Sequence, residues 1–330
     1  MIESINNEFL TFSLAIIILS LFLDLILGEL PNSIHPVVII GKIISFLTNH
    51  LIKIKNKLSG LLLVILTVFL TLIIFITILF ISTINLYLFL IISILILSST
   101  FSVKLLLSSA NDMKHDLIFD IEKARASLAY LVSRNTKELD EEHIISATIE
   151  SLSENIVDSY ISPIFYLFIG LILLNLLNID FHVKIIVLIS IPLIYRVVNT
   201  LDAMVGYKNE KYSKIGFVPA KTDDILNFIP SRISGILIVI VSFILNFNWK
   251  NSYKTLLNDS KKCPSPNSGY PMSATAGALG IQLIKENVYI IGNKDKRLDI
   301  TDITYSINLI KTTIYLFTLV LLIITILVCK

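Results

Sequence analysis

Between Lys57 and Lys104 the chain runs for 46 residues without a charged side chain. A membrane-spanning helix needs about 20 apolar residues, so this stretch predicts a hairpin of two spans, near 60–80 and 83–103. The composition agrees, because 16% of the residues are charged, whereas about a quarter are charged in a soluble domain. The sequence therefore predicts an all-α fold, that of a polytopic helical membrane protein with about 5–7 membrane helices and polar helical loops on one face.

The other apolar segments extend this architecture to a single integral-membrane domain over residues 1–330. They lie near 9–27, 161–179, 183–199, 233–249 and 312–329, and the polar loops between the segments cover 28–57, 104–160, 200–232 and 250–310. The excess of lysine in 28–57 favours a cytoplasmic position for that loop. The first segment has no basic residue before it and is expected to be a retained anchor rather than a signal peptide.

The segment 233–249 is the weak point of this topology. Its length corresponds to about 26 Å of helix, which is short for an apolar core of about 30 Å, and the polar loop that follows it is rich in basic residues. We expect a re-entrant helix that returns to the side it came from. The chain is then a multi-pass protein of the cell membrane whose polar loops are mainly cytoplasmic.

Charge and cysteine usage exclude several other classes of protein. The net charge is +2 and the basic residues form no continuous run, so nothing indicates a nucleic-acid partner. The two cysteines, Cys263 and Cys329, are far apart and support neither a disulfide framework nor a thiolate metal site. The sequence also has no G-x-x-x-x-G-K-[ST] loop and no dinucleotide fingerprint.

Three carboxylates precede the apolar segment at 161–179. Read as a helix, Glu150, Glu154 and Asp158 follow one another at intervals of four and share a face, where like charges repel by about 0.2–0.5 kcal/mol per pair. Either arginines neutralise them in a structural ion-pair network, or they hold Mg²⁺, which prefers carboxylate oxygen, with Asn155 beside them. The arginines available for ion pairs are Arg125, Arg134 and Arg196.

Two further polar segments carry residues that suit phosphate groups. The segment 195–232 mixes acids, bases and amides, as a site for a metal-bound nucleotide requires, and Thr222 is expected to start a helix there. The run "SPNSGYP" at 265–271 predicts a tight turn before a helix of small residues, a place where anions can bind. Asp24, near the end of the first apolar segment, is either hydrated at the interface or paired with another group.

Six runs of the sequence occur together in one order: "HPVVIIGK", "LVSRNTKELD", "ATIESLSENIVDSYISPIFY", "YRVVNTLDAMVGYKNEKY", "AKTDDILNFIPSR" and "SPNSGYP". In combination they are highly specific, and over about residues 20–290 the chain resembles the CobD/CbiB family of cobalamin-biosynthesis membrane proteins, the adenosylcobinamide-phosphate synthases. The family's usual Arg-Asp-Thr appears here as Arg134-Asn135-Thr136.

The resemblance implies an enzyme whose reaction is an ATP-dependent amide ligation. Aminopropanol or its O-phosphate would be joined to a propionate carboxylate of adenosylcobyric acid, giving adenosylcobinamide or its phosphate. It implies ATP and Mg²⁺ as co-substrate and ion, the corrinoid as substrate, the lipid bilayer as surroundings, and other corrinoid-pathway enzymes as further partners. An acyl-phosphate intermediate is the expected form of the activated carboxylate.

On this resemblance we assign roles to the residues above. The catalytic set is Glu150, Glu154, Asp158 and Asn155, one of whose carboxylates would take the proton of the attacking ammonium. The Mg²⁺ ligands would come from Glu150, Glu154, Asp158, Asp223 and Asp224. The residues that would bind phosphate or substrate are Arg134, Arg196, Asn199, Lys221, Arg232, Asn267, Ser268 and Gly269.

Two other functions compete with the ligase. A transporter of cations or small solutes could use Asp24 and the acidic face as a relay, although transporters often show repeated halves and this chain has no internal repeat. A non-catalytic membrane scaffold would tolerate loss of the acidic face. A single catalytic site would require all the polar segments to face one side, which favours the re-entrant form of 233–249.

Overall fold

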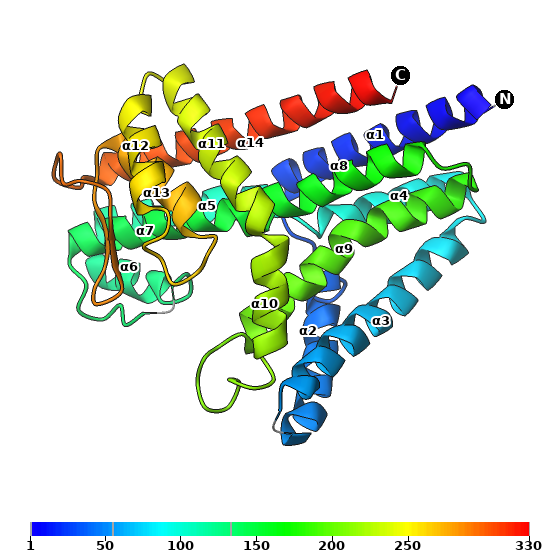
Figure 1. The fold of residues 1–330 in the computed structure, drawn as a ribbon, viewed down its shortest axis with the longest axis horizontal. Helices are drawn as coiled ribbons and strands as arrows, with labels where there is room; N and C mark the ends of the chain where they lie inside the picture. The colour runs from blue at the N-terminus through cyan, green and yellow to red at the C-terminus, as the bar shows by residue number, and fades with distance from the viewer. Residues whose placement is uncertain (1, 55, 133, 330) are drawn as a thin grey trace. The chain divides into compact units, whose positions relative to one another are not determined.

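The computed structural model describes residues 2–54, 56–132 and 134–329 and is almost entirely helical in that part (Figure 1). Seven of its described helices are long and apolar enough to cross a membrane, or eight if the broken pair α10 and α11 counts as one span. This confirms the predicted all-α, polytopic membrane protein. The backbone contacts divide the chain into two compact units, each built from segments that are far apart in sequence, and the single integral-membrane domain stays a prediction. Each unit is described by itself.

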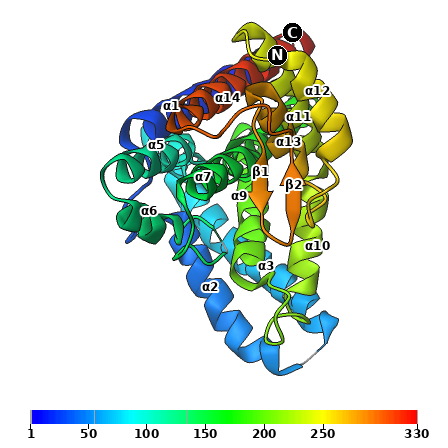
Figure 2. The same cartoon turned by 90° about the vertical axis from the view of Figure 1, so that its left-hand side faces the viewer.

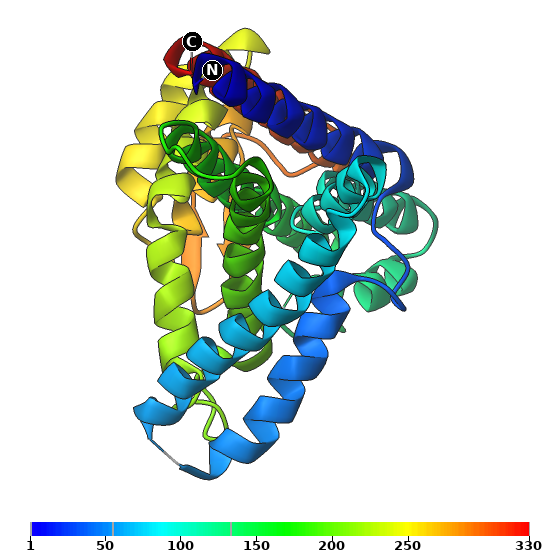
Figure 3. The ribbon, with the colours of Figure 1, turned by 90° about the vertical axis from the view of Figure 1, so that its right-hand side faces the viewer.

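The first unit contains Met1–Lys104, Ser162–Leu226 and Leu321–Lys330. Its elements are α1 (Ile2–Leu27), α2 (Pro36–Leu51), the 3₁₀ turn η1 (Ile52–Ile54), α3 (Lys57–Ser82), α4 (Leu86–Ser98), α8 (Ser162–Asn175), α9 (Phe181–Val205) and α10 (Phe217–Leu226). In Figure 3, α2 and α3 lie side by side in blue and light blue, and α3 also packs on α9. Gly60, in the first turn of α3, approaches the loop between α9 and α10 closely, because a Cβ there would lie 2.4 Å from the carbonyl oxygen of Ile215.

The second unit contains Leu105–Ile161 and Asn227–Val320. Its elements are α5 (Val103–Phe119), α6 (Ile121–Leu128), α7 (Glu141–Ile156), the π-helical turn η2 (Val157–Ile161), α11 (Phe228–Ile244), α12 (Trp249–Asp259), α13 (Gly269–Leu279), β1 (Leu283–Lys285), β2 (Tyr289–Ile291) and α14 (Ile300–Val328). The small residues of α13 are buried and let α11, α12 and α7 approach it closely. Figure 2 shows the β1–β2 hairpin beside α13 and α7.

The structure differs from the sequence-based expectations in three places. The loop predicted over 28–57 contains α2, which starts at Pro36 with His35 as its N-cap and is long enough to be a further span. Thr222 does not start a helix, because α10 begins at Phe217. The expected 233–249 segment falls on α11, which ends at Ile244 and is separated from α10 by a break at Asn227, so its re-entrant form stays a prediction.

Asp24 has a structural partner. Its Oδ2 accepts hydrogen bonds from the backbone N–H groups of Val103, at 2.9 Å, and Lys104, at 3.2 Å. These two residues begin α5, so the carboxylate caps that helix across about 80 positions of sequence. Lys104 in turn donates from Nζ to the carbonyl of Ile26, at 2.6 Å. Of the two alternatives for Asp24, the paired one is therefore the one observed.

Candidate functional site

The predicted site residues fall into two groups, one in each unit. The second unit holds Arg134, Glu150, Glu154, Asn155, Asp158, Arg232, Asn267, Ser268 and Gly269, and the first holds Arg196, Asn199, Lys221, Asp223 and Asp224. The joint action of the two groups in one site stays a prediction. Each group forms its own network of contacts, described in turn below.

Glu150 is the centre of the network in the second unit. It lies on the buried face of α7, and 2% of its surface is exposed. Its Oε1 accepts a 2.7 Å hydrogen bond from the hydroxyl of Ser146, one turn earlier on the helix. Its Oε2 accepts from the guanidinium of Arg134 and from the phenol of Tyr289, the latter at 2.7 Å. Three donors therefore hold one buried carboxylate in a single orientation.

The β1–β2 hairpin supplies part of this network. The backbone N–H of Ile284 donates to the Ser146 hydroxyl at 3.0 Å, and the Ile284 carbonyl accepts from Arg134 at 3.2 Å. The strands pair with Lys285 opposite Tyr289, and Asn287 in the connecting loop has a φ of 57°, a left-handed conformation that asparagine tolerates. The same backbone contacts that dock the hairpin on α7 therefore also bring Tyr289 to Glu150.

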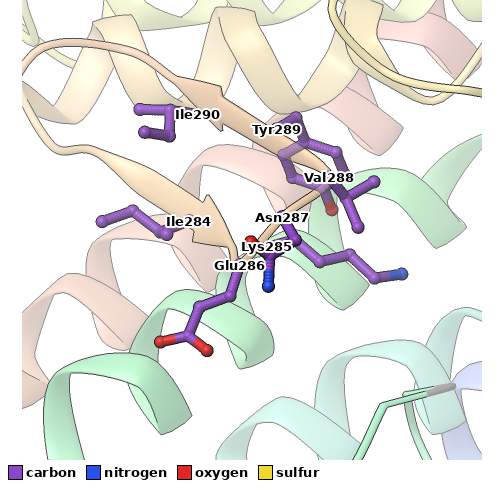
Figure 4. Close-up of a pocket in the computed structure, with 7 residues that line it drawn as sticks. All are labelled: Ile284, Lys285, Glu286, Asn287, Val288, Tyr289 and Ile290. Atoms are coloured by element: carbon purple, nitrogen blue, oxygen red, sulfur yellow. The ribbon is translucent and has the colours of Figure 1, made fainter.

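The hairpin borders an open hollow of about 460 Å³. Figure 4 shows the side chains that line it, with Lys285 and Glu286 extending from the loop end. The lining residues are Ile284, Lys285, Glu286, Asn287, Val288, Tyr289 and Ile290. Its walls are a mixture of aliphatic, aromatic and charged groups, which suits a ligand that is polar in part.

Glu154 and Asp158 differ from Glu150 in exposure. The Glu154 side chain is exposed and that of Asp158 is half-buried, and the two carboxylates interact electrostatically. The α-helix ends at Ile156 and continues as the π-helical turn that carries Asp158. The regular spacing of four that the sequence suggested therefore does not extend to Asp158. Such turns interrupt helices frequently at functional sites. Asn155 donates to the hydroxyl of Ser151 at 3.1 Å.

The carboxylates of α7 shift the pKa values of two groups outside the candidate membrane spans, the Tyr289 phenol and the Cys263 thiol. Burial raises the pKa of the Tyr289 phenol, and Glu150 and Glu154 raise it further. Burial also raises the pKa of the Cys263 thiol, to about 11, while a hydrogen bond with Ser268 opposes the shift and Glu154 and Glu150 add to it. The turn before α13 therefore lies within electrostatic range of the acidic helix.

Arg232 and Asn267 connect α11 with that turn. The Arg232 guanidinium lies 3.5 Å from the ring centroid of Phe228 and 4.2 Å from that of Tyr270, a stacked arrangement that favours arginine over lysine. It donates to Oδ1 of Asn267 at 3.1 Å and to the carbonyl of Pro266 at 3.3 Å.

The remaining residues of the turn, Ser268 and Gly269, are buried. A Cβ on Gly269 would lie 2.0 Å from the carbonyl oxygen of Ser260, so close packing alone requires glycine there. Ser268 serves the electrostatic network through its hydrogen bond with Cys263. The predicted anion site at this helix start stays a prediction.

The group in the first unit lies on α9 and α10. Arg196 donates to Oδ1 of Asn199 at 3.1 Å, and Asn199 donates to Asp223 at 3.4 Å. Nε of Arg196 is buried and has no hydrogen-bond partner among the described residues. Burial lowers the pKa of the neighbouring His35. The negative charge of Glu29 opposes this shift, and the positive charge of Arg196 adds to it.

Lys221 and Asp224 form an ion pair on α10. The Lys221 ammonium pairs with the Asp224 carboxylate at 2.9 Å, and the lysine side chain is exposed. Asp223 is buried and is held by Asn199, so the two neighbouring aspartates have different surroundings. A surface ion pair of this kind contributes little to stability.

The fit of these residues to Mg²⁺ is uneven. No group of three or more His, Cys, Asp and Glu side chains could hold a metal ion within the described ranges. Both oxygens of Glu150 already accept hydrogen bonds, which matches the alternative of a structural ion pair with Arg134. Mg²⁺ that is bound together with phosphates needs only one or two carboxylates. Glu154 and Asp158 fit that smaller requirement.

Sequence reasoning missed several members of the network. Ser146, Tyr289, Lys285, Cys263 and His35 were not assigned roles. The signal for Ser146 was its position four residues before Glu150, which places both on one face of a helix. Tyr289 and Lys285 carried no such signal, since only the docking of the hairpin brings them to α7.

A family model described as "CobD/Cbib protein" matches residues 17–317. "Probable cobalamin biosynthesis protein CobD" of Methanothermobacter thermautotrophicus is 41% identical over 307 residues, which cover 92% of this chain and 95% of that protein. "Cobalamin biosynthesis protein CobD" of Listeria monocytogenes is 39% identical over 307 residues, with 89% and 92% covered. The protein of the same name from Clostridium perfringens is 38% identical over 323 residues, with 93% and 96% covered. No solved structure matches significantly.

Proposed function

The chain belongs to the CobD/CbiB family of cobalamin biosynthesis proteins, and from this premise we propose that it is a membrane-bound, ATP-dependent amide ligase. Its substrates would be adenosylcobyric acid and aminopropanol or aminopropanol O-phosphate. The product would be adenosylcobinamide or its phosphate. The observation that carries the proposal is that α7 presents two carboxylates in different surroundings. Glu150 is buried and held by three donors, whereas Glu154, one turn later, is exposed.

Amide formation requires an activated carboxylate and a neutral amine. ATP would supply the activation by transferring its terminal phosphoryl group to a propionate oxygen of the corrinoid. The amine nitrogen then forms the C–N bond, phosphate leaves with the C–O bond electrons, and the ammonium proton must pass to a base. One carboxylate of the acidic helix would accept that proton, and Glu150 is the poorest candidate, because both of its oxygens already accept hydrogen bonds.

Charge and geometry suggest the other roles. Glu150 would position Arg134, whose guanidinium could present a second edge to a phosphate while one edge stays on the carboxylate. Arg232 is held in place by a different means, because its guanidinium stacks on the rings of Phe228 and Tyr270. In the first unit, the residues that would bind phosphate or Mg²⁺ are Arg196, Asn199, Lys221, Asp223 and Asp224. In the second unit, Glu154 and Asp158 are the carboxylates that would hold Mg²⁺ together with a phosphate.

The transporter alternative is less well supported by the contacts. It depended on Asp24 as a relay group within the membrane. That carboxylate accepts two backbone hydrogen bonds at the start of α5, which is sufficient reason for an acid at this position. The scaffold alternative predicts that the network around Glu150 serves stability alone.

The proposal is tested in membrane vesicles that contain the protein. Adenosylcobyric acid and Mg-ATP are supplied with either aminopropanol or its phosphate, and the corrinoid mass is followed. We expect a mass gain that corresponds to one new amide bond and requires ATP. The variant Glu154→Ala should abolish the mass gain. Glu154→Gln should alter the dependence of the activity on Mg²⁺ while substrate binding is retained.

Glu138→Ala is the matched control, since Glu138 is an exposed acid of the same unit with no role in the network. It should retain the activity of the wild type. Full activity in Glu154→Ala would exclude the role given to that residue. No mass gain with either amine in the wild type would count against the ligase itself and favour a transporter or a scaffold.

A further inference from the structure

The first unit carries a basic surface whose lysines are not among the residues given a role in the proposed reaction. Two segments of the described residues form it: 52–54 with 56–60, where α2 leads into α3, and the loop between α9 and α10, over 206–216. Their exposed lysines, Lys53, Lys57, Lys208, Lys211 and Lys214, are called the lysine surface below. Across both segments the sequence contains one acid, Glu210. The surface therefore has a strong positive charge with little internal neutralisation.

The two segments meet although about 150 residues of sequence separate them. Gly60, in the first turn of α3, approaches the carbonyl of Ile215 so closely that a Cβ would lie 2.4 Å from that oxygen. The Lys57 ammonium lies 3.7 Å from the ring centroid of Phe217. In both Figure 1 and Figure 3 the turn and the loop lie at the same end of α3. The lysines consequently share one end of the unit.

That end is also where candidate membrane spans begin and end. The span that contains α2 ends at Ile54, that of α3 begins at Lys57, and that of α9 ends at Val205. Large apolar side chains are exposed among the lysines: Ile54 at 42%, Leu58 at 55%, Tyr207 at 53% and Phe217 at 40%. Exposed aromatic and basic residues at the ends of apolar helices are typical of the membrane–water interface.

We propose that the lysine surface binds the headgroups of anionic phospholipids. A headgroup suits it better than free phosphate, because the exposed apolar side chains beside the lysines would contact the acyl chains attached to the same molecule. Each lysine near such a surface contributes about fivefold in affinity. The contact would hold this end of the unit at the leaflet that is richer in anionic lipid, normally the cytoplasmic one.

Native mass spectrometry of the purified, full-length protein tests this inference. The protein in detergent is titrated with phosphatidylglycerol or with phosphatidylcholine that has the same acyl chains, and the bound lipids are counted. We expect phosphatidylglycerol to bind at least about fivefold more tightly at about 50 mM salt. Because the attraction is between charges near water, the preference should largely disappear at about 500 mM salt. This salt series needs no variant and so does not depend on how a variant folds.

Matched variants locate the site. Lys208→Gln/Lys211→Gln/Lys214→Gln should abolish the preference or leave less than about twofold of it. The control, Lys137→Gln/Lys250→Gln/Lys254→Gln, removes the same charge from exposed lysines of the second unit and should keep the preference.

Four outcomes would overturn the inference. These are equal binding of the two lipids by the wild type, a preference that persists at high salt, an equal loss in the control variant, and displacement of the lipid by millimolar inorganic phosphate. The last would identify a small phosphate ligand as the occupant of the surface.

Discussion

The phenol of Tyr289 donates a 2.7 Å hydrogen bond to the carboxylate of Glu150 across 139 positions of sequence. Ser146 and Arg134 reach the same carboxylate, and both also bind the backbone of Ile284 in the hairpin. Docking of the hairpin and orientation of the carboxylate are therefore achieved by the same side chains. A change at any one of them should be detectable both in stability and in activity.

Tyr289→Phe removes one donor and leaves the ring in place. The lost hydrogen bond ends on a buried charged group, so the free energy of unfolding should fall by about 1.5–3 kcal/mol. The amide-forming activity should fall as well, because Glu150 and Arg134 become less well oriented. Thermal unfolding in detergent and the vesicle assay measure the two effects. Tyr253→Phe, at a tyrosine that is 50% exposed on α12, should change neither. Equal stability of the two variants would contradict the role of this contact.

The same phenol predicts a pH dependence of stability. Burial and the charge of Glu150 raise its pKa above the ordinary value of 10.0, so the folded protein holds the phenol proton more tightly than the unfolded chain does. Its contribution is complete below pH 10.0 and is lost as the pH rises further, by up to about 1.4 kcal/mol per pH unit. The melting temperature of the wild type should therefore fall more steeply above pH 10.0 than that of Tyr289→Phe. Parallel curves would refute this assignment.

Arg134 and Glu150 allow a test of whether their pair is structural or functional. Arg134→Met leaves a buried carboxylate without its cation and should cost about 3–5 kcal/mol of unfolding free energy. Arg134→Met/Glu150→Met removes both charges, so much of the stability should return. If the pair belongs to a catalytic site, activity should not return with it. Melting temperature and corrinoid mass, measured on the same preparations, separate the two roles; an active double variant would show that the pair only stabilises the fold.

Hydropathy was sufficient to predict most of the helices that are candidate membrane spans, but it missed α2. The uncharged stretch at 58–103 and the apolar segments after it fall on α3, α4, α8, α9 and α14. Helix α2 lies within the polar loop that the sequence predicts over 28–57. Its proline, Pro36, occupies the first turn, where a missing N–H does no harm. A proline can therefore begin a helix as well as interrupt one.

For the candidate site too, relations between residues close in sequence could be predicted, whereas contacts between distant segments could not. Spacing along a helix predicts that Glu150 and Glu154 lie near one another, and turn chemistry predicts the tight turn at 265–269; their part in a functional site stays a prediction. Nothing in the local sequence relates Tyr289 to Glu150, because that contact depends on the register of a three-residue strand, β2, against β1. The π-helical turn at 157–161 could not be foreseen either: its residues, VDSYI, are weak helix formers, but that does not distinguish a π turn from an α-helical one.

Asp24 provides a last prediction, which separates a helix cap from a proton relay. Asp24→Ala removes the acceptor for the N–H groups of Val103 and Lys104 and should lower the unfolding free energy by about 0.5–2 kcal/mol. Asp24→Asn keeps an oxygen in that place and should be close to the wild type in melting temperature and in amide formation, because asparagine caps helices as well as aspartate does. Asp112→Ala, at an exposed aspartate within α5, is the matched control and should have little effect. If Asp24→Asn lost activity while its melting temperature stayed unchanged, the carboxylate would be needed for its charge or its proton, and the transporter alternative would regain its main support.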